Sequence, residues 1–194
     1  MKLNTLLLLL VGLFLLSCSA PAEEGQTEEN TSAAQVSTPE GPSPEDKLAE
    51  MGITLPEPSA PVANYVNAVR TGNLLFLAGK GPTKPEGGYV TGKVGTDLSI
   101  EEGAEAAKLA ALQHIGVLKA TLGSLDKVKR LVKVHGMVNC GPDFTNQPEV
   151  MNGYSNFMVE VFGEKGKHAR AAVGMGSLPR GIAVEVELVV EVED

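Results

Sequence analysis

Two charged residues near the carboxyl terminus, Arg170 and Glu185, have the types and the setting for carboxylate binding. Arg170 precedes a strand-like run at residues 171–175, and Glu185 lies early in a second run at residues 182–192. A planar guanidinium group can hold a carboxylate through two parallel hydrogen bonds, so the two side chains could converge on one carboxylate-binding pocket. Alternatively, Arg170 is a surface arginine beside solvated glutamates, because long charged side chains are mostly exposed.

The two runs have the patterns of strands. In the second run, apolar and mostly acidic residues alternate with a period of two, which predicts a strand with one apolar face and most of its glutamates in solvent. Residues 176–181 contain two glycines and a proline between the runs and predict a turn-rich connection.

Six further elements must position these two residues. Residues 64–69 and 74–78 predict a hairpin that turns at Gly72–Asn73. Ser99 and Glu102 form a capping box, and apolar residues at helical spacing predict a long helix up to Gly123. A strand at 128–138 and a helix at 147–162 follow, and a short helix near residue 48 precedes them all. The order strand, strand, helix, strand, helix, strand, strand predicts an α+β domain with two long helices on one face of a mixed sheet.

Charge is distributed unevenly along the 194 residues. The formal net charge is −8, but residues 47–194 contain 15 Lys and Arg against 17 Asp and Glu, whereas residues 18–46 contain seven acids and no base. The folded part is therefore nearly neutral. Because it has no basic block with interleaved aromatic residues, we expect no nucleic-acid partner.

The amino terminus has the features of a bacterial lipoprotein signal. Lys2 precedes an apolar run at residues 6–16, which is shorter than the roughly 20 residues of a membrane span. The run ends in Leu15-Leu16-Ser17-Cys18, which resembles a lipobox, so we expect cleavage before Cys18 and its acylation. An uncleaved anchor and an ordinary secreted cysteine are the alternatives. Ser19 is similar to residues that follow the cysteine of outer-membrane lipoproteins, so the expected location is the outer membrane, facing the periplasm, with membrane contact through the lipid only.

Residues 19–46 are rich in Glu, Pro, Ser, Thr and Gly and contain little that a core could bury. Such a segment is expected to remain a flexible tether. The sequence therefore divides into a signal peptide (1–17), an acidic tether (18–46) and a folded domain (47–194).

Several motifs together resemble the RidA/YjgF family, also called endoribonuclease L-PSP. They are the hairpin that contains Tyr65, the stretch Leu77-Ala78-Gly79-Lys80-Gly81-Pro82, the helix that contains Asn152, and Ala169-Arg170-Ala171-Ala172-Val173 followed by Leu178-Pro179 and Val184-Glu185-Val186-Glu187. The resemblance covers about residues 61–191. It implies a chorismate-mutase-like fold and a homotrimer with three sites between subunits.

The resemblance also implies an activity and a set of site residues. The best-known branch of the family hydrolyses reactive enamines and imines derived from amino acids to 2-oxo acids and ammonia, without a metal or an organic cofactor. By position, Arg170 matches the arginine that holds the substrate carboxylate, and Glu185 matches the acid that places the attacking water. Tyr65, Gly79 and Asn152 match residues of the substrate pocket.

Two departures from the family pattern keep other functions open. Some relatives have a cysteine at the position of Ala172 and a tyrosine at the position of Ser155, and the enzymes that produce such imines usually work in the cytosol. The protein can therefore be a periplasmic deaminase, a trimeric protein that binds a small carboxylate without turnover, or a ribonuclease. The near-neutral charge and the lack of a paired histidine and acid disfavour the ribonuclease.

Two other residues with reactive side chains have simpler interpretations. His114 lies on the long helix among apolar residues, which predicts a packed or surface histidine because no second ligand or base stands one turn away. Cys140 follows the strand at 128–138 in a glycine-containing loop and is expected to be a half-buried thiol without nucleophilic machinery.

Overall fold

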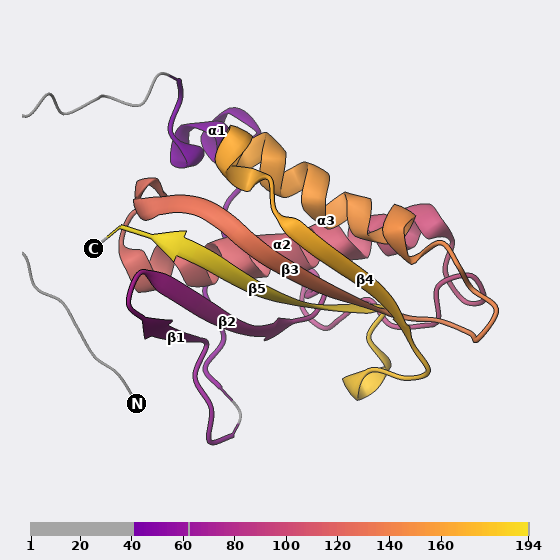
Figure 1. Cartoon of the computed structure of the whole chain (residues 1–194). Helices are drawn as coiled ribbons and strands as arrows, with labels where there is room; N and C mark the ends of the chain where they lie inside the picture. Colours follow the sequence, from indigo (N-terminus) through magenta and orange to yellow (C-terminus); the bar gives the residue numbers. More distant parts are fainter. Residues whose placement is uncertain (1–40, 62, 194) are drawn as a thin grey trace, which may run out of the picture. The chain divides into compact units, whose positions relative to one another are not determined.

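The computed structural model describes residues 41–61 and 63–193 (Figure 1). The helices are α1 (Pro44–Glu50), α2 (Ile100–Leu122) and α3 (Gln147–Phe162), and the strands are β1 (Ala68–Thr71), β2 (Leu74–Lys80), β3 (Val128–Asn139), β4 (Ala169–Met175) and β5 (Val184–Val192). Short 3₁₀ turns are η1 (Leu125–Lys127), η2 (Gly163–Gly166) and η3 (Pro179–Gly181). Over these residues, none of the helices is both long and apolar enough to span a bilayer.

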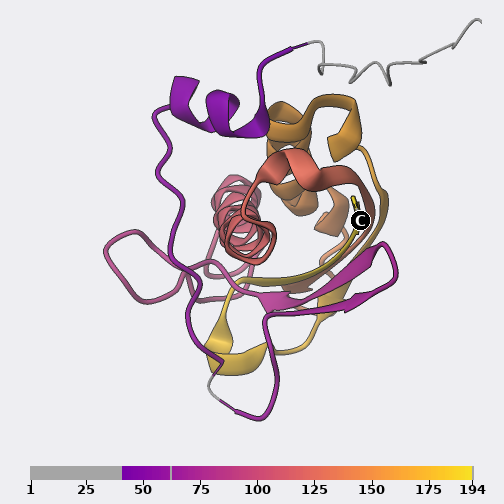
Figure 2. The same cartoon turned by 90° about the vertical axis from the view of Figure 1, so that its left-hand side faces the viewer.

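One five-stranded sheet, in the order β1-β2-β5-β3-β4, carries both long helices on the same face (Figures 1 and 2). Strands β3 and β4 are parallel, and the other neighbouring pairs are antiparallel. Parallel neighbours need a crossover, which α3 supplies between β3 and β4. The predicted α+β architecture and the predicted order of elements are confirmed.

The core lies between the sheet and the two helices. Helix α2 contributes small residues, and a side chain at Gly153 of α3 would collide with the backbone of Ala104 on α2, so the two helices approach closely at this point. Alternate residues of β5 face the two helices and are buried in the core: Val184, Val186, Leu188, Val190 and Val192. The opposite face of the sheet therefore carries Glu185, Glu187 and Glu191, in agreement with the predicted alternation.

Each of the five strands differs from its predicted bounds at one or both ends. Strand β1 begins at Ala68 rather than at Asn64, β4 begins at Ala169 rather than at Ala171, and β5 begins at Val184 rather than at Ile182. The turn at Gly72–Asn73 is confirmed, because Thr71 pairs directly with Leu74. Periodicity finds an element, but hydrogen bonds to its neighbours decide where a strand ends.

The helix ends agree closely with their local signals. The Ser99 hydroxyl accepts from the Glu102 N–H at 3.1 Å, and the Glu102 carboxylate accepts from the Ser99 N–H at 2.7 Å, so the capping box is formed. Gly123 adopts a left-handed conformation at φ 78° and ends α2. Helix α3 has the predicted bounds.

Helix α1 begins inside the segment that the sequence assigned to the tether. Ser43 caps it, and Leu48 is buried in the core. The Glu45 carboxylate accepts from the Leu125 N–H at 2.8 Å and from the Lys119 ammonium at 2.9 Å. These bonds attach α1 to the end of α2 and to η1.

Candidate functional site

Three of the predicted site residues line one cavity on the open face of the sheet, opposite the helices. The cavity has a volume of about 290 Å³, at the lower limit of the usual range for small-molecule sites. Its lining is Ser59, Ala60, Tyr65, Gly79, Gly81, Tyr89, Pro179, Arg180, Ile182 and Glu185. The structure thus brings Tyr65, Gly79 and Glu185 together, although they lie before β1, on β2 and on β5.

Gly79 is required by the position of the Glu185 carboxylate. A Cβ atom at residue 79 would overlap Glu185 Oε1, so any side chain there would displace the acid. Burial, and to a smaller extent the neighbouring Glu187 carboxylate, raises the pKa of Glu185 above its usual value. A half-buried acid with a raised pKa is suited to proton transfer.

A β-bulge turns the backbone at Gly79. Leu77 pairs with Leu188 and Lys80 pairs with Val186, so three steps along β2 match two along β5. The Ala78 carbonyl at this bulge lies 3.2 Å from Nε2 of His114 in the core. Because a trans peptide places its C=O and N–H in opposite directions, the Gly79 N–H points to the face that carries Glu185.

His114 and Tyr154 support this bulge from the helical side of the sheet through hydrogen bonds. His114 is fully buried, and burial lowers its pKa to about 3, so the imidazole is neutral. Nε2 must donate to the Ala78 carbonyl, which leaves Nδ1 to accept from the Tyr154 hydroxyl at 2.9 Å. The prediction of a packed histidine is confirmed, but its contact with the backbone beside Gly79 is a finding of the structure.

Arg170 and Asn152 meet at a second place, at the edge of the sheet beside α3. Arg170 Nη1 donates to Asn152 Oδ1 at 3.1 Å and to Ser155 Oγ at 3.0 Å, and Nη2 donates to the Pro148 carbonyl at 3.3 Å. Within the described part of the chain, these bonds leave Nε–H and one Nη2–H of the guanidinium without a partner. This edge can hold a carboxylate with two bonds.

Ser155 and His168 position the arginine, and the sequence did not reveal their role. The Ser155 hydroxyl lies 3.0 Å from His168 Nε2, and His168 Nδ1 lies 2.7 Å from the Gly166 carbonyl. His168 therefore donates from Nδ1 and accepts the Ser155 proton at Nε2, which leaves the Ser155 oxygen to accept from Arg170. The spacing held a signal, because Ser155 lies about one helical turn after Asn152 and His168 lies two residues before Arg170.

The two groups of residues do not meet within one chain. Strand β3 lies between β4 and β5, and Arg170 pairs with Val134 whereas Glu185 pairs with Met137. Arg170 reaches toward α3 on the helical side, and Glu185 projects from the opposite face. Within one chain these two side chains therefore do not converge on one pocket, and a site that uses both needs a second copy.

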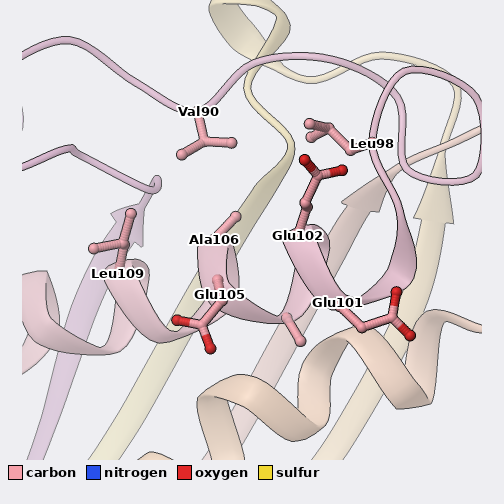
Figure 3. A pocket seen from close by; sticks show the side chains of 8 residues that line it. Val90, Leu98, Glu101, Glu102, Glu105, Ala106 and Leu109 are labelled. Carbon is pink, nitrogen blue, oxygen red and sulfur yellow. The ribbon is translucent and has the colours of Figure 1, made fainter.

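Two other cavities contain none of the predicted substrate-site residues. One, of about 620 Å³, lies at the start of α2 and is lined by Glu101, Glu102 and Glu105 together with apolar residues (Figure 3). Its carboxylates would repel an anionic substrate. The other, of about 560 Å³, is lined by Lys93 and Cys140 among others. Cys140 is only 3% exposed, so it is more buried than the sequence predicted.

Two further observations concern metal and ribonuclease chemistry. Among residues 41–61 and 63–193, no three His, Cys, Asp or Glu side chains cluster to hold a metal ion. His135 Nδ1 lies 3.3 Å from Glu187 Oε2 on the open face, so one sequence argument against a ribonuclease, the lack of a paired histidine and acid, is wrong. The argument from the near-neutral charge is unaffected.

Comparison with known families places residues 45–192 in the family described as "YjgF/chorismate_mutase-like, putative endoribonuclease". The chain belongs to this family. Protein TCP17 of Trypanosoma cruzi is 46% identical over 148 residues, which span 76% of this chain and 92% of that protein. Protein HMF1 of Saccharomyces cerevisiae is 31% identical over 136 residues, which span 70% and 89%.

Solved structures of relatives have the same fold. Protein Atu1372 of Agrobacterium tumefaciens, of unknown function, is 42% identical with a TM-score of 0.71 and covers 77% of this chain and 94% of its own. A protein of Shewanella oneidensis described as "a putative endoribonuclease" is 30% identical with a TM-score of 0.75, over 78% of this chain and 100% of its own. The chorismate-mutase-like fold of the RidA/YjgF family is thereby confirmed.

The predicted signal peptide, Cys18 and nearly all of the tether lie outside the described residues. Their assignments remain predictions.

Proposed function

We propose that this RidA/YjgF-family protein hydrolyses amino-acid-derived imines, and enamines after their conversion to imines, to 2-oxo acids and ammonia. The observation that carries this proposal is the cavity in which the Glu185 carboxyl, with its raised pKa, lies against Gly79 and beside Tyr65. An imine carbon is already electrophilic, so the protein needs only to position a water molecule and to transfer protons.

The chemistry follows from the groups around Glu185. The carboxylate takes a proton from water as the water oxygen bonds to the imine carbon, and it passes this proton to the imine nitrogen, which produces a neutral tetrahedral aminoalcohol. Glu185 then transfers the hydroxyl proton of the aminoalcohol to the nitrogen, the C–N bond breaks with its electron pair on nitrogen, and ammonia leaves as the carbonyl forms. The Gly79 N–H, directed to the same face, can donate to the substrate while it changes charge.

The substrate carboxylate would be held by Arg170 of a second copy, because Arg170 and Glu185 of one chain project to different sides of the sheet. A homotrimer with three sites between subunits fits this requirement. Apolar side chains on the surface, among them Val69 and Phe76 at 56% and 46% exposure, support assembly because such groups favour a partner.

The test uses the full-length protein and freshly generated 2-iminobutanoate. Release of 2-oxobutanoate should exceed the spontaneous rate, and 2-oxobutanoate itself should bind in calorimetry. Arg170→Ala should weaken that binding by about 2–5 kcal/mol, the usual cost of removing one partner of a charged pair. Binding without faster hydrolysis would instead identify a carboxylate-binding protein, and the absence of both would disprove the proposed site.

A further inference from the structure

The backbone of Arg180 is unusual. Among the non-glycine residues that the structure describes, only Arg180 has a positive φ, with φ 59° and ψ 14°. Gly181 follows at φ 68°, and the Ile182 N–H donates to the Pro179 carbonyl at 3.3 Å. Two positive φ angles and this bond are typical of a type I′ turn, in which Gly, Asn or Asp is preferred at the place of Arg180. A bulky residue in such a conformation suggests a function for its side chain.

The Arg180 side chain lies at the cavity that holds Glu185. Arg180 lies on the η3 turn between β4 and β5 (Figure 1). Its side chain and that of Tyr89 both line this cavity. Arg180 Nη1 donates to the Tyr89 hydroxyl at 3.1 Å, and the guanidinium carbon lies 5.6 Å from the centre of the Tyr89 ring. Tyr89 thus contacts one side of the guanidinium group and accepts a hydrogen bond from only one of the five N–H groups of Arg180.

No carboxylate neutralises this guanidinium within the described residues. The ion pairs found there do not include Arg180, although Glu185 lines the same cavity. A guanidinium group with unused donors at the rim of a small cavity is suited to bind an anion.

We propose that Arg180 forms a second anion subsite, which selects 2-imino acids and 2-oxo acids that carry a second, distal carboxylate. This inference rests on the proposed function: Arg170 of the neighbouring copy would hold the first carboxylate beside the reacting carbon, and Arg180 would hold the other. Monocarboxylic substrates of the same length would leave Arg180 unused. The subsite therefore determines specificity and leaves the hydrolytic step to Glu185.

The test compares two ligands that differ only at the distal group, 2-oxoglutarate and 2-oxopentanoate, on the full-length protein and on Arg180→Asn. Calorimetry should show tighter binding of 2-oxoglutarate to the parent. Arg180→Asn should weaken 2-oxoglutarate about tenfold or more, the usual effect of a lost charged hydrogen bond, and leave 2-oxopentanoate within about twofold. Arg180→Lys, which keeps the charge, should retain part of the preference.

Thermal unfolding separates this role from a structural one. Asparagine tolerates the left-handed conformation, so the midpoint of Arg180→Asn should equal or exceed that of the parent. A lower midpoint, or an equal change in affinity for both ligands, would overturn the subsite. If the parent binds 2-oxopentanoate through Arg170 but has no preference for 2-oxoglutarate, only the subsite fails; if it binds neither ligand, the proposed function fails with it.

Discussion

At the scale of single residues, Glu185 is the group on which hydrolysis should depend. Because its pKa is raised, the carboxylate that accepts the proton of water is formed only as pH rises through that raised value. The value of kcat/KM should therefore increase with pH across this range and then level off. Glu185→Gln should reduce hydrolysis by roughly 10²–10⁴ and leave the binding of 2-oxobutanoate nearly unchanged. A variant that retains the parental rate and pH profile would exclude Glu185 as the proton acceptor.

His114 gives a prediction that combines stability and activity. His114→Leu leaves the Ala78 carbonyl and the Tyr154 hydroxyl without their partner, and it should lower the free energy of unfolding by about 1–3 kcal/mol. Imine hydrolysis should also fall, because the Gly79 N–H is no longer fixed. His114→Gln offers one donor and one acceptor and should recover part of both losses. Denaturant unfolding and the imine assay measure the two effects.

The pH dependence of stability provides a control for His114. Its pKa is about 3 in the folded protein, below its ordinary value of 6.5, so the unfolded chain binds the extra proton between these values. The folded protein should therefore lose stability as pH falls from about 6.5 to 3, and His114→Gln should show a smaller loss. Equal pH dependence of the two proteins would mean that His114 is not held neutral in the core.

The residues of the site differ in how far the sequence could predict them. The family motifs implied Arg170, Asn152, Tyr65, Gly79 and Glu185 as residues of one site, but not their division into two groups within a chain. Ser155, His168 and Tyr154 escaped prediction, because their roles arise from hydrogen bonds that α3 makes with β4 and α2. Spacing along the chain shows which residues share a face, but not which atoms of another element they reach.

At the scale of elements, α3 supports both parts of the site from neighbouring positions. Tyr154 bonds to His114, which holds the bulge beside Gly79, and Ser155 bonds to Arg170. The periodicity of residues 147–162 predicted this helix with its correct ends. The pairing of the strands was less predictable, since a strand's neighbours depend on crossovers and register rather than on its own sequence. Strands β4 and β5 illustrate this point, because they are consecutive in the chain but β3 lies between them in the sheet.

The polar part of the attachment of α1, through the Glu45 carboxylate, is testable. Burial opposes ionisation of Glu45, but hydrogen bonds from the Leu125 N–H and Lys119 lower its pKa overall. A lowered pKa stabilises the folded state above the unfolded value, and this contribution is lost as pH falls through the folded value. Glu45→Gln should therefore lower the thermal midpoint at neutral pH, with the difference from the parent vanishing in acid. Glu50→Gln, which removes an exposed pair with Lys47, is the matched control and should have little effect.

At the scale of the whole molecule, the predicted anchor depends on the sulfur of Cys18. A Cys18→Ala variant expressed in a Gram-negative bacterium should lose both metabolic labelling by fatty acid and retention in the outer-membrane fraction, because the acyl chains are the expected membrane contact. The distribution of the protein after membrane fractionation measures this. Unchanged retention without labelling would show that the apolar segment at residues 6–16 holds the protein instead.

The proposed assembly makes the strictest demand on the site, because the proposed mechanism takes Arg170 and Glu185 from different copies. In Arg170→Ala and in Glu185→Gln, every site of a homotrimer is defective, so each variant alone should hydrolyse the imine far more slowly than the parent. Mixed trimers behave differently: a site between an intact Arg170 of one copy and an intact Glu185 of the next is complete, although neither copy is. Random mixing in equal amounts produces such a site at about one interface in four.

Unfolding the two variants together and refolding them should therefore restore about one quarter of the parental imine hydrolysis, whereas a site within one chain would restore none. Native mass spectrometry of the refolded sample must show trimers, and a monomer at micromolar concentration would remove the shared site altogether.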